Sequence, residues 1–225
     1  MTRAKICGIT RERDLAVAVE AGADAVGFIA DVSVETPREV EPADAADLVA
    51  ATPPLVTSVL VTMPDSPGRA VELTRAIGPD AVQLYGNFDA DDVRFVRAET
   101  GAKVIPAMDY DERDRALAVD AAADAILLDS TEDGAGGTGE TGDWEATRKL
   151  VAELSAPAIL AGGLGPENVR RAAETVRPFA VDVASGVESQ GGRKDADAVR
   201  EFVREAAAVD HAEDVLSTDI SEEHR

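Results

Sequence analysis

The chain has 225 residues, of which 45% are hydrophobic and only 4% are aromatic. This length is long for an average domain but normal for a single α/β barrel, whose core would be built from Val, Ala, Leu and Ile. Acidic residues outnumber basic residues by 44 to 22, which gives a net charge of −22. Because phosphate groups repel such a surface, the composition argues against nucleic acid as a partner.

Two explanations of the acidic composition compete. The carboxylates could form a patch that binds a partner, or they could keep the chain soluble at high salt, where ions screen their mutual repulsion. The acids are spread along the whole chain, and the lysines are few, namely Lys5, Lys103, Lys149 and Lys194. This even spread favours adaptation to high salt.

Cysteine content and apolar runs indicate where the protein works. Cys7 is the single cysteine, which excludes an intrachain disulfide and favours a reducing compartment. No apolar run reaches the roughly 18 residues that suggest a membrane-spanning helix, and the N-terminal apolar segment is too short for a signal peptide. We therefore expect a soluble, cytoplasmic protein that does not bind membranes.

Short apolar, β-branched runs alternate with segments of helical apolar spacing along the chain. The predicted strands are 4–9, 25–30, 55–62, 81–85, 103–108, 125–130, 157–163 and 179–185. The predicted helices are 13–23, 42–52, 65–77, 89–99, 111–120, 143–154, 166–175 and 195–208. Continuous apolar strands separated by helices indicate parallel strands that are covered by helices.

Eight such units predict a single closed (β/α)8 TIM barrel over residues 1–209, with an open doubly wound sheet as the alternative. The remaining residues, 210–225, are acidic and weakly periodic, and we predict a short flexible tail. Asp24, Asp80 and Asp124 each follow a helix and precede a strand within similar segments. We predict a structural role for them, because that end of a barrel lies opposite the active site.

Candidate reactive side chains follow the first and sixth predicted strands, at the end of the barrel that carries active sites. Cys7 ends the first strand, where Lys5 on the same face would favour its thiolate, although a lone cysteine often only packs. Asp129 ends the apolar run AILLD, where burying a carboxylate is costly. It could therefore be a catalytic acid, or it could cap a neighbouring loop. We expect Lys5 to pair with Asp182 on the eighth strand, across the closure of the barrel.

Candidate anion-binding groups follow other strands. Two glycine-rich loops follow the last two strands, GGLGPENV and SGVES. A helix is predicted from Pro166 in the first loop, and glycine in both allows the backbone to approach a phosphate closely. Tight turns alone are the alternative explanation. Arg38, in an extended loop after the second strand, could bind a substrate carboxylate bidentately or simply be solvated.

These motifs together resemble one family. KICGIT, TPREV, AVQLYG, LLDS with GGTGETGDW, LAGGLGPENV and VDVASGVES with GGRKD occur in this order over about residues 4–205. They resemble the phosphoribosylanthranilate isomerases of tryptophan biosynthesis. The resemblance implies an Amadori rearrangement of N-(5′-phosphoribosyl)anthranilate to 1-(2-carboxyphenylamino)-1-deoxyribulose 5-phosphate, without a cofactor or metal.

The resemblance also implies roles for particular residues. Cys7 would be the general base, Asp129 the general acid and Arg38 the contact for the anthranilate carboxylate. The other substrate-binding candidates are Gly162, Gly163, Ser185 and Gly186 around the phosphate, Gly137 and Thr138 as a cover, and Gln83 and Asp182 inside the barrel mouth.

Some positions depart from the family pattern, and other functions remain open. Tyr85 stands where the family usually has His, Gly142 stands where it has Phe, and the second loop reads VETPR without the usual Ser. A related isomerisation in histidine synthesis is not excluded. A pentose-phosphate epimerase is disfavoured because no His lies in the barrel region, and the presence of Cys7 and Asp129 disfavours a non-catalytic phosphate binder or a redox sensor. We expect a monomer or homodimer whose partner is a small phosphorylated molecule.

Overall fold

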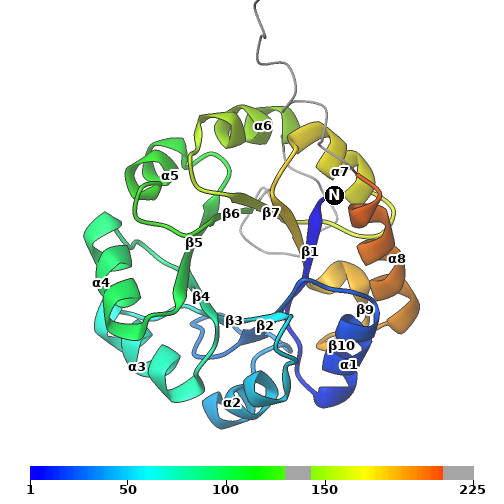
Figure 1. The fold of residues 1–225 in the computed structure, drawn as a ribbon, viewed down its shortest axis with the longest axis horizontal. Helices are drawn as coiled ribbons and strands as arrows, with labels where there is room; N and C mark the ends of the chain where they lie inside the picture. Colours follow the sequence, from blue (N-terminus) through cyan, green and yellow to red (C-terminus); the bar gives the residue numbers. More distant parts are fainter. Residues whose placement is uncertain (130–142, 210–225) are drawn as a thin grey trace, which may run out of the picture.

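The computed structural model describes residues 1–129 and 143–209, and in these ranges it forms a closed barrel surrounded by helices (Figure 1). The parallel strands follow chain order: β1 Arg3–Ile6, β2 Ala25–Ile29, β3 Thr57–Thr62, β4 Ala81–Tyr85, β5 Lys103–Asp109, β6 Ile126–Asp129, β7 Ala158–Ala161 and β8 Ala180–Val183. The helices are α1 Glu12–Glu20, α2 Pro42–Ala51, α3 Pro67–Ile77, α4 Ala90–Thr100, α5 Arg113–Val119, α6 Trp144–Glu153, α7 Val169–Val176 and α8 Ala196–Ala207. The predicted TIM barrel is confirmed. The predicted tail at 210–225 lies outside the described residues and stays a prediction.

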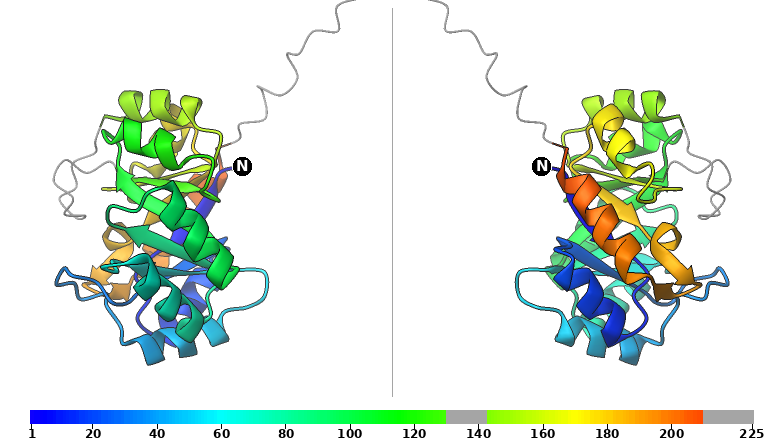
Figure 2. Two further views of the ribbon diagram at one scale, coloured as in Figure 1. Left: turned by 90° about the vertical axis from the view of Figure 1, so that its left-hand side faces the viewer. Right: turned by 90° about the vertical axis from the view of Figure 1, so that its right-hand side faces the viewer.

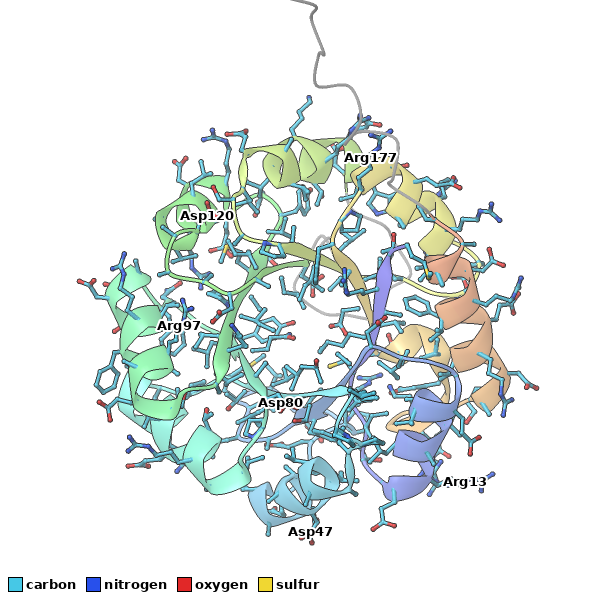
Figure 3. All side chains as sticks on the ribbon, viewed as in Figure 1. Arg13, Asp47, Asp80, Arg97, Asp120 and Arg177 are labelled. Atoms are coloured by element: carbon cyan, nitrogen blue, oxygen red, sulfur yellow. The ribbon has the colours of Figure 1, made fainter. Side chains whose placement is uncertain are left out.

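Strand residues pack on both faces, which explains why the strands read as continuous apolar runs. Side chains such as Val61, Ile105 and Leu127 fill the barrel interior. Alternate residues such as Phe28 and Leu60 pack outward against the helices. The outer faces of the helices carry charged side chains, among them the labelled residues Arg13 and Asp47 (Figure 3).

The acids that precede β2, β4 and β6 have the structural role predicted for them. The carboxylates of Asp24, Asp80 and Asp124 accept the backbone N–H groups of Ala4, Ser58 and Val104 at 2.9, 2.8 and 3.0 Å. Each acid thus binds the start of the preceding strand in the barrel. Gly78 has φ of +72° and ends α3 in the left-handed conformation that glycine adopts without strain.

The structure differs from the prediction after β7 and after β8. The helix predicted from Pro166 begins at Val169, because the Asn168 side chain closes a turn by accepting from Gly165 N–H and donating to the Gly163 carbonyl. After β8, a single 3₁₀ turn, η1 Ser185–Val187, leads into an unpredicted antiparallel hairpin of β9 Glu188–Gln190 and β10 Arg193–Lys194.

Figure 2 shows this hairpin at the same end of the barrel as the loop between β2 and α2, while the N-terminus lies at the other end. The first end is therefore the one formed by the carboxyl ends of the strands. Within the described ranges, no helix has both the length and the apolar character needed to cross a membrane.

Candidate active site

A cavity of about 420 Å³ opens at the carboxyl ends of the strands. Its lining includes most of the predicted site residues, namely Cys7, Arg38, Asp129, Gly162, Gly163, Asp182 and Ser185. The barrel thus brings groups that are far apart in the sequence to one place. Gly137 and Thr138 lie outside the described residues. Among the described residues, no three or more His, Cys, Asp or Glu side chains form a group that could hold a metal ion.

Cys7 is the first residue after β1, and the closure of the barrel fixes its backbone. Its N–H donates to the Val183 carbonyl of β8 at 2.8 Å. The side chain needs the glycine on the neighbouring strand, because a Cβ at Gly27 would lie 2.9 Å from the Cys7 Sγ and 3.1 Å from the Lys5 Nζ. Gly27 therefore provides the space that the thiol and the ammonium group occupy.

Lys5 and Asp182 form the predicted ion pair across the closure of the barrel. They lie opposite each other in the β1–β8 register, and the Nζ to Oδ1 distance is 2.9 Å. Both side chains are buried. Burial acts to lower the pKa of Lys5, but the charges and hydrogen bonds of Asp182 and Cys7 outweigh burial and raise the pKa. Lys5 is therefore a fixed cation beneath the thiol.

Lys5 favours the Cys7 thiolate, as expected, but burial of the thiol has the larger effect. Burial of the Cys7 thiol raises its pKa above the ordinary value, and this effect exceeds the opposing effect of the Lys5 charge. The Asp182 carboxylate raises the pKa further, whereas Lys194 lowers it. The protonated thiol is thus favoured, because burial disfavours the charged form more strongly than the nearby cations favour it.

Lys194 is a site residue that the sequence interpretation missed. It lies on β10, is buried, and donates to the Ala184 carbonyl at 2.9 Å and to Glu188 Oε1 at 2.8 Å. Burial lowers the pKa of Lys194, although Glu188 acts against this effect. One signal was available in the sequence, because the chain contains only four lysines. Two of them, Lys5 and Lys194, are buried beside the only cysteine.

Arg38 is held by a second residue that was not predicted. Its Nε and Nη2 donate to Oε1 and Oε2 of Glu188 at 2.9 and 2.8 Å. Its aliphatic part packs over Gly8, where a Cβ would lie 2.8 Å from the Arg38 Cδ. Burial acts to raise the pKa of Glu188, but hydrogen bonds from Arg38 and Lys194 outweigh burial and lower it. Arg38 is therefore not freely solvated but held by Glu188.

Asp129 and Tyr85 line the wall of the cavity that β4 and β6 provide. Asp129 is half-buried and ends β6. Burial of the Tyr85 phenol raises its pKa well above the ordinary value, and the charge of Asp129 adds to this effect. Tyr85 consequently keeps its proton where the family usually has His. Gln83 is buried and interacts with Tyr85 but does not line the cavity, so its role in substrate binding stays a prediction.

The loops after β7 and β8 pack against each other and form a concave wall. Gly162 and Gly163 have φ of +91° and +61°, which glycine adopts without strain. A Cβ at Gly186 would lie 2.0 Å from the Leu164 carbonyl oxygen, so Gly186 serves this close packing. It does not line the cavity, and its predicted phosphate contact stays a prediction. Gly163 and Ser185 do line it.

Comparison with known proteins agrees with this site. The sequence profile of the N-(5′-phosphoribosyl)anthranilate (PRA) isomerase family matches residues 4–205. The N-(5′-phosphoribosyl)anthranilate isomerase of Halorubrum lacusprofundi is 58% identical over 92% of this chain and 97% of the relative. That of Haloferax volcanii is 55% identical over 96% of this chain and all of the relative.

Solved structures give the same result. The phosphoribosyl anthranilate isomerase of Thermotoga maritima has a TM-score of 0.84 and 37% identity over 93% of this chain and all of that chain. An isomerase in complex with reduced 1-(o-carboxyphenylamino)-1-deoxyribulose 5-phosphate has a TM-score of 0.80 and 35% identity over the same shares. Monomers generated from the dimeric Thermotoga maritima isomerase have a TM-score of 0.80 and 34% identity, again over the same shares. The chain therefore belongs to the N-(5′-phosphoribosyl)anthranilate isomerase family of tryptophan biosynthesis.

Proposed function

We propose that Cys7 and Asp129 carry out the isomerisation that defines the family, the conversion of N-(5′-phosphoribosyl)anthranilate to 1-(2-carboxyphenylamino)-1-deoxyribulose 5-phosphate. The observation that supports these roles is their position on different walls of one cavity, after β1 and at the end of β6. A substrate between them would meet an acid on one side and a base on the other.

The proposed reaction needs two proton transfers in sequence. Asp129 protonates the furanose ring oxygen, and the ring C1–O bond breaks as the nitrogen lone pair forms an iminium at C1. Cys7, as thiolate, then removes the proton from C2, and the electrons of that C–H bond form the enolamine. Protonation at C1 and loss of the hydroxyl proton give the ketone. General acid–base catalysis of this kind typically contributes about 10²–10⁴-fold to the rate.

The remaining groups would bind the two anionic ends of the substrate. Gly162, Gly163 and Ser185 would hold the phosphate where the loops after β7 and β8 meet, and Arg38 would hold the anthranilate carboxylate. Arg38 lines the cavity, and Lys5 and Lys194 act on Cys7 from beside it, although Asp182 and Glu188 pair with these cations. The cations would attract the anionic groups of the substrate at short range, in a protein whose net charge is −22.

Of the two assembly states that we expect, a homodimer is favoured by the end of the barrel opposite the site. Leu55, in the loop before β3, is 95% exposed, and it borders a cavity of about 410 Å³ that is lined largely by apolar atoms. Phe179 lies on the same rim and is 45% exposed. A second copy would cover these side chains, since exposed apolar surface of this kind often marks an interface.

We propose the cytoplasm as the compartment, where Cys7 stays a free thiol.

The activity is tested with purified protein, anthranilate, phosphoribosyl pyrophosphate and the transferase that couples them, by following the decay of fluorescence. Cys7→Ser and Asp129→Asn should each lower kcat by about 10²–10⁴-fold. Asp114→Asn is the matched control, because the Asp114 side chain is exposed on the outer helix α5 and does not line the cavity. Absence of decay at both low and molar salt would refute the isomerase. A Cys7→Ser variant with full rate would refute the role of Cys7 as base.

Gly27→Ala tests the space that the Cys7 side chain needs. The added methyl group would displace the Cys7 Sγ or the Lys5 Nζ, so we expect kcat to fall by about ten-fold or more, as for small misplacements of reacting groups. Gly68→Ala is the control, because nothing lies within 4 Å of its Cβ position and α3 tolerates alanine. Folding of both variants is verified by circular dichroism. Equal kcat values would contradict the claim that the Cys7 and Lys5 side chains need the space at Gly27.

The pH dependence of kcat/KM reports the pKa of the base in the free enzyme. Because the pKa of Cys7 is raised and the thiolate is the active form, kcat/KM should rise with pH and reach half its maximum above the ordinary pKa of a thiol. Lys194→Met removes a cation that favours the thiolate, so the midpoint should move to still higher pH. An unchanged or lower midpoint in this variant would show that Lys194 does not act on Cys7.

The assembly is tested by light scattering during size-exclusion chromatography in molar salt. The wild-type chain should elute with twice the monomer mass, and Leu55→Asp should elute as a monomer, because a carboxylate cannot be buried unpaired at such an interface. Phe95→Asp is the control, because it alters another exposed apolar side chain, on the outer helix α4, and it should leave the mass unchanged. A wild-type chain that elutes with the monomer mass would contradict the proposed homodimer and support the other predicted state, a monomer.

A further inference from the structure

We propose that Glu188 is a positioning residue for substrate binding: it holds one edge of the Arg38 guanidinium so that the opposite edge faces the cavity and receives the substrate carboxylate. This inference rests on the proposed role of Arg38 as the carboxylate contact and adds the residue that orients it. Glu188 itself does not line the cavity and would not touch substrate.

The geometry of the guanidinium group allows Arg38 to bind Glu188 and the substrate carboxylate at the same time. Its N–H groups form a planar fork, and a carboxylate can bind the edge made by Nε and Nη2 or the edge made by Nη1 and Nη2. Glu188 occupies the first edge, with both of its oxygens engaged. Among the described residues, no hydrogen bond to Arg38 Nη1 occurs. The second edge therefore remains for a second carboxylate.

The hairpin that carries Glu188 is fastened to the barrel at several points. The Thr10 hydroxyl donates to the Gly192 carbonyl at 2.7 Å, and Lys194 N–H donates to the buried Asp14 carboxylate at 3.2 Å. Pro37, the residue before Arg38, packs directly on the hairpin turn, since a Cβ at Gly192 would lie 2.3 Å from the Pro37 carbonyl oxygen. A carboxylate on so firmly held a segment can fix the direction of a long side chain.

The charges of the cluster leave it attractive to an anion. Arg38 and Lys194 both donate to Glu188, so two positive charges meet one negative charge. An isolated Arg–Glu pair would be neutral, whereas this group of three keeps one positive charge next to the cavity. Lys194 therefore allows Glu188 to orient Arg38 without cancelling the attraction between Arg38 and the substrate carboxylate.

Two opposite roles of Glu188 make different predictions for KM. If Glu188 orients Arg38, Glu188→Gln loses the charge-assisted bonds, Arg38 samples other rotamers, and KM rises. If Glu188 competes with the substrate for Arg38, the same variant frees the guanidinium and KM falls. The first outcome follows from the structure, because Glu188 binds Nε and Nη2 of Arg38 and leaves Nη1 to a second carboxylate.

The experiment measures kcat and KM for wild type, Glu188→Gln, Arg38→Gln and the double variant in the coupled fluorescence assay. We expect Glu188→Gln to raise KM by about ten-fold with kcat within about three-fold, as for loss of a buried charge-assisted contact that acts on binding alone. Glu174→Gln is the matched control, since Glu174 pairs with Arg170 on the outer surface of α7 and makes the same change in net charge. Its kinetic constants should equal those of wild type.

Binding measurements by calorimetry separate orientation of Arg38 from general damage to the site. Glu188→Gln should weaken binding of reduced 1-(o-carboxyphenylamino)-1-deoxyribulose 5-phosphate by about ten-fold but leave the affinity for inorganic phosphate unchanged, because phosphate does not need Arg38. A purely structural role would weaken both.

The outcomes distinguish this inference from the proposed function. The double variant should have the KM of Arg38→Gln alone, because the effect of Glu188 on binding of the substrate carboxylate passes through Arg38. Multiplicative effects of the two substitutions on KM, or a lower KM in Glu188→Gln, would overturn the inference while the isomerase function stands. An inactive wild-type chain would refute the function itself, and an unchanged KM in Arg38→Gln would overturn the inference together with the assignment of Arg38.

Discussion

The pairing of β1 with β8, which closes the barrel, is the constraint on which the site depends. It sets Lys5 opposite Asp182 and binds the Cys7 N–H to the Val183 carbonyl. It also places the thiol beside the loops that follow β7 and β8. A buried ion pair adds little net stability, but removing one partner typically costs about 3–5 kcal/mol, because the other charge is left without compensation. The pair therefore strongly favours one register of closure, and that register positions the thiol.

The electrostatics of the site differ from those of the surface in a way that suits high salt. The excess carboxylates lie mainly on the exposed faces of the helices, where salt screens their repulsion. The charges around the cavity, those of Lys5, Asp182, Glu188 and Lys194, are buried and are screened much less. Relatives from Halorubrum and Haloferax are more than half identical to this chain, which agrees with the interpretation of its acidic composition. A surface adapted to salt can thus surround a site whose charges act at short range.

The fold and the candidate reactive residues were predictable because their signals are local. Each strand is an apolar run, and Cys7 and Asp129 stand at the ends of such runs. Glu188 and Lys194 were not predicted, since the hairpin strands are short and polar, and one glutamate among 44 acidic residues carries no distinguishing pattern. The direction of the pKa shift of Cys7 could not be predicted for a related reason. Sequence spacing places Lys5 beside the thiol, but it gives neither the extent of burial nor the opposing charge of Asp182.

The central claim is that Cys7 is a buried base whose pKa is set by burial against the charges of Lys5, Lys194 and Asp182. Because Cys7 is the only cysteine, the rise in ultraviolet absorbance during a pH titration of the wild type, minus that of Cys7→Ser to remove tyrosine ionisation, reports on this residue alone. The midpoint in the wild-type protein should lie above that of a free cysteine, and Lys5→Met should move it higher still. A wild-type midpoint at or below that of free cysteine, or a Lys5→Met midpoint that does not rise, would contradict this account.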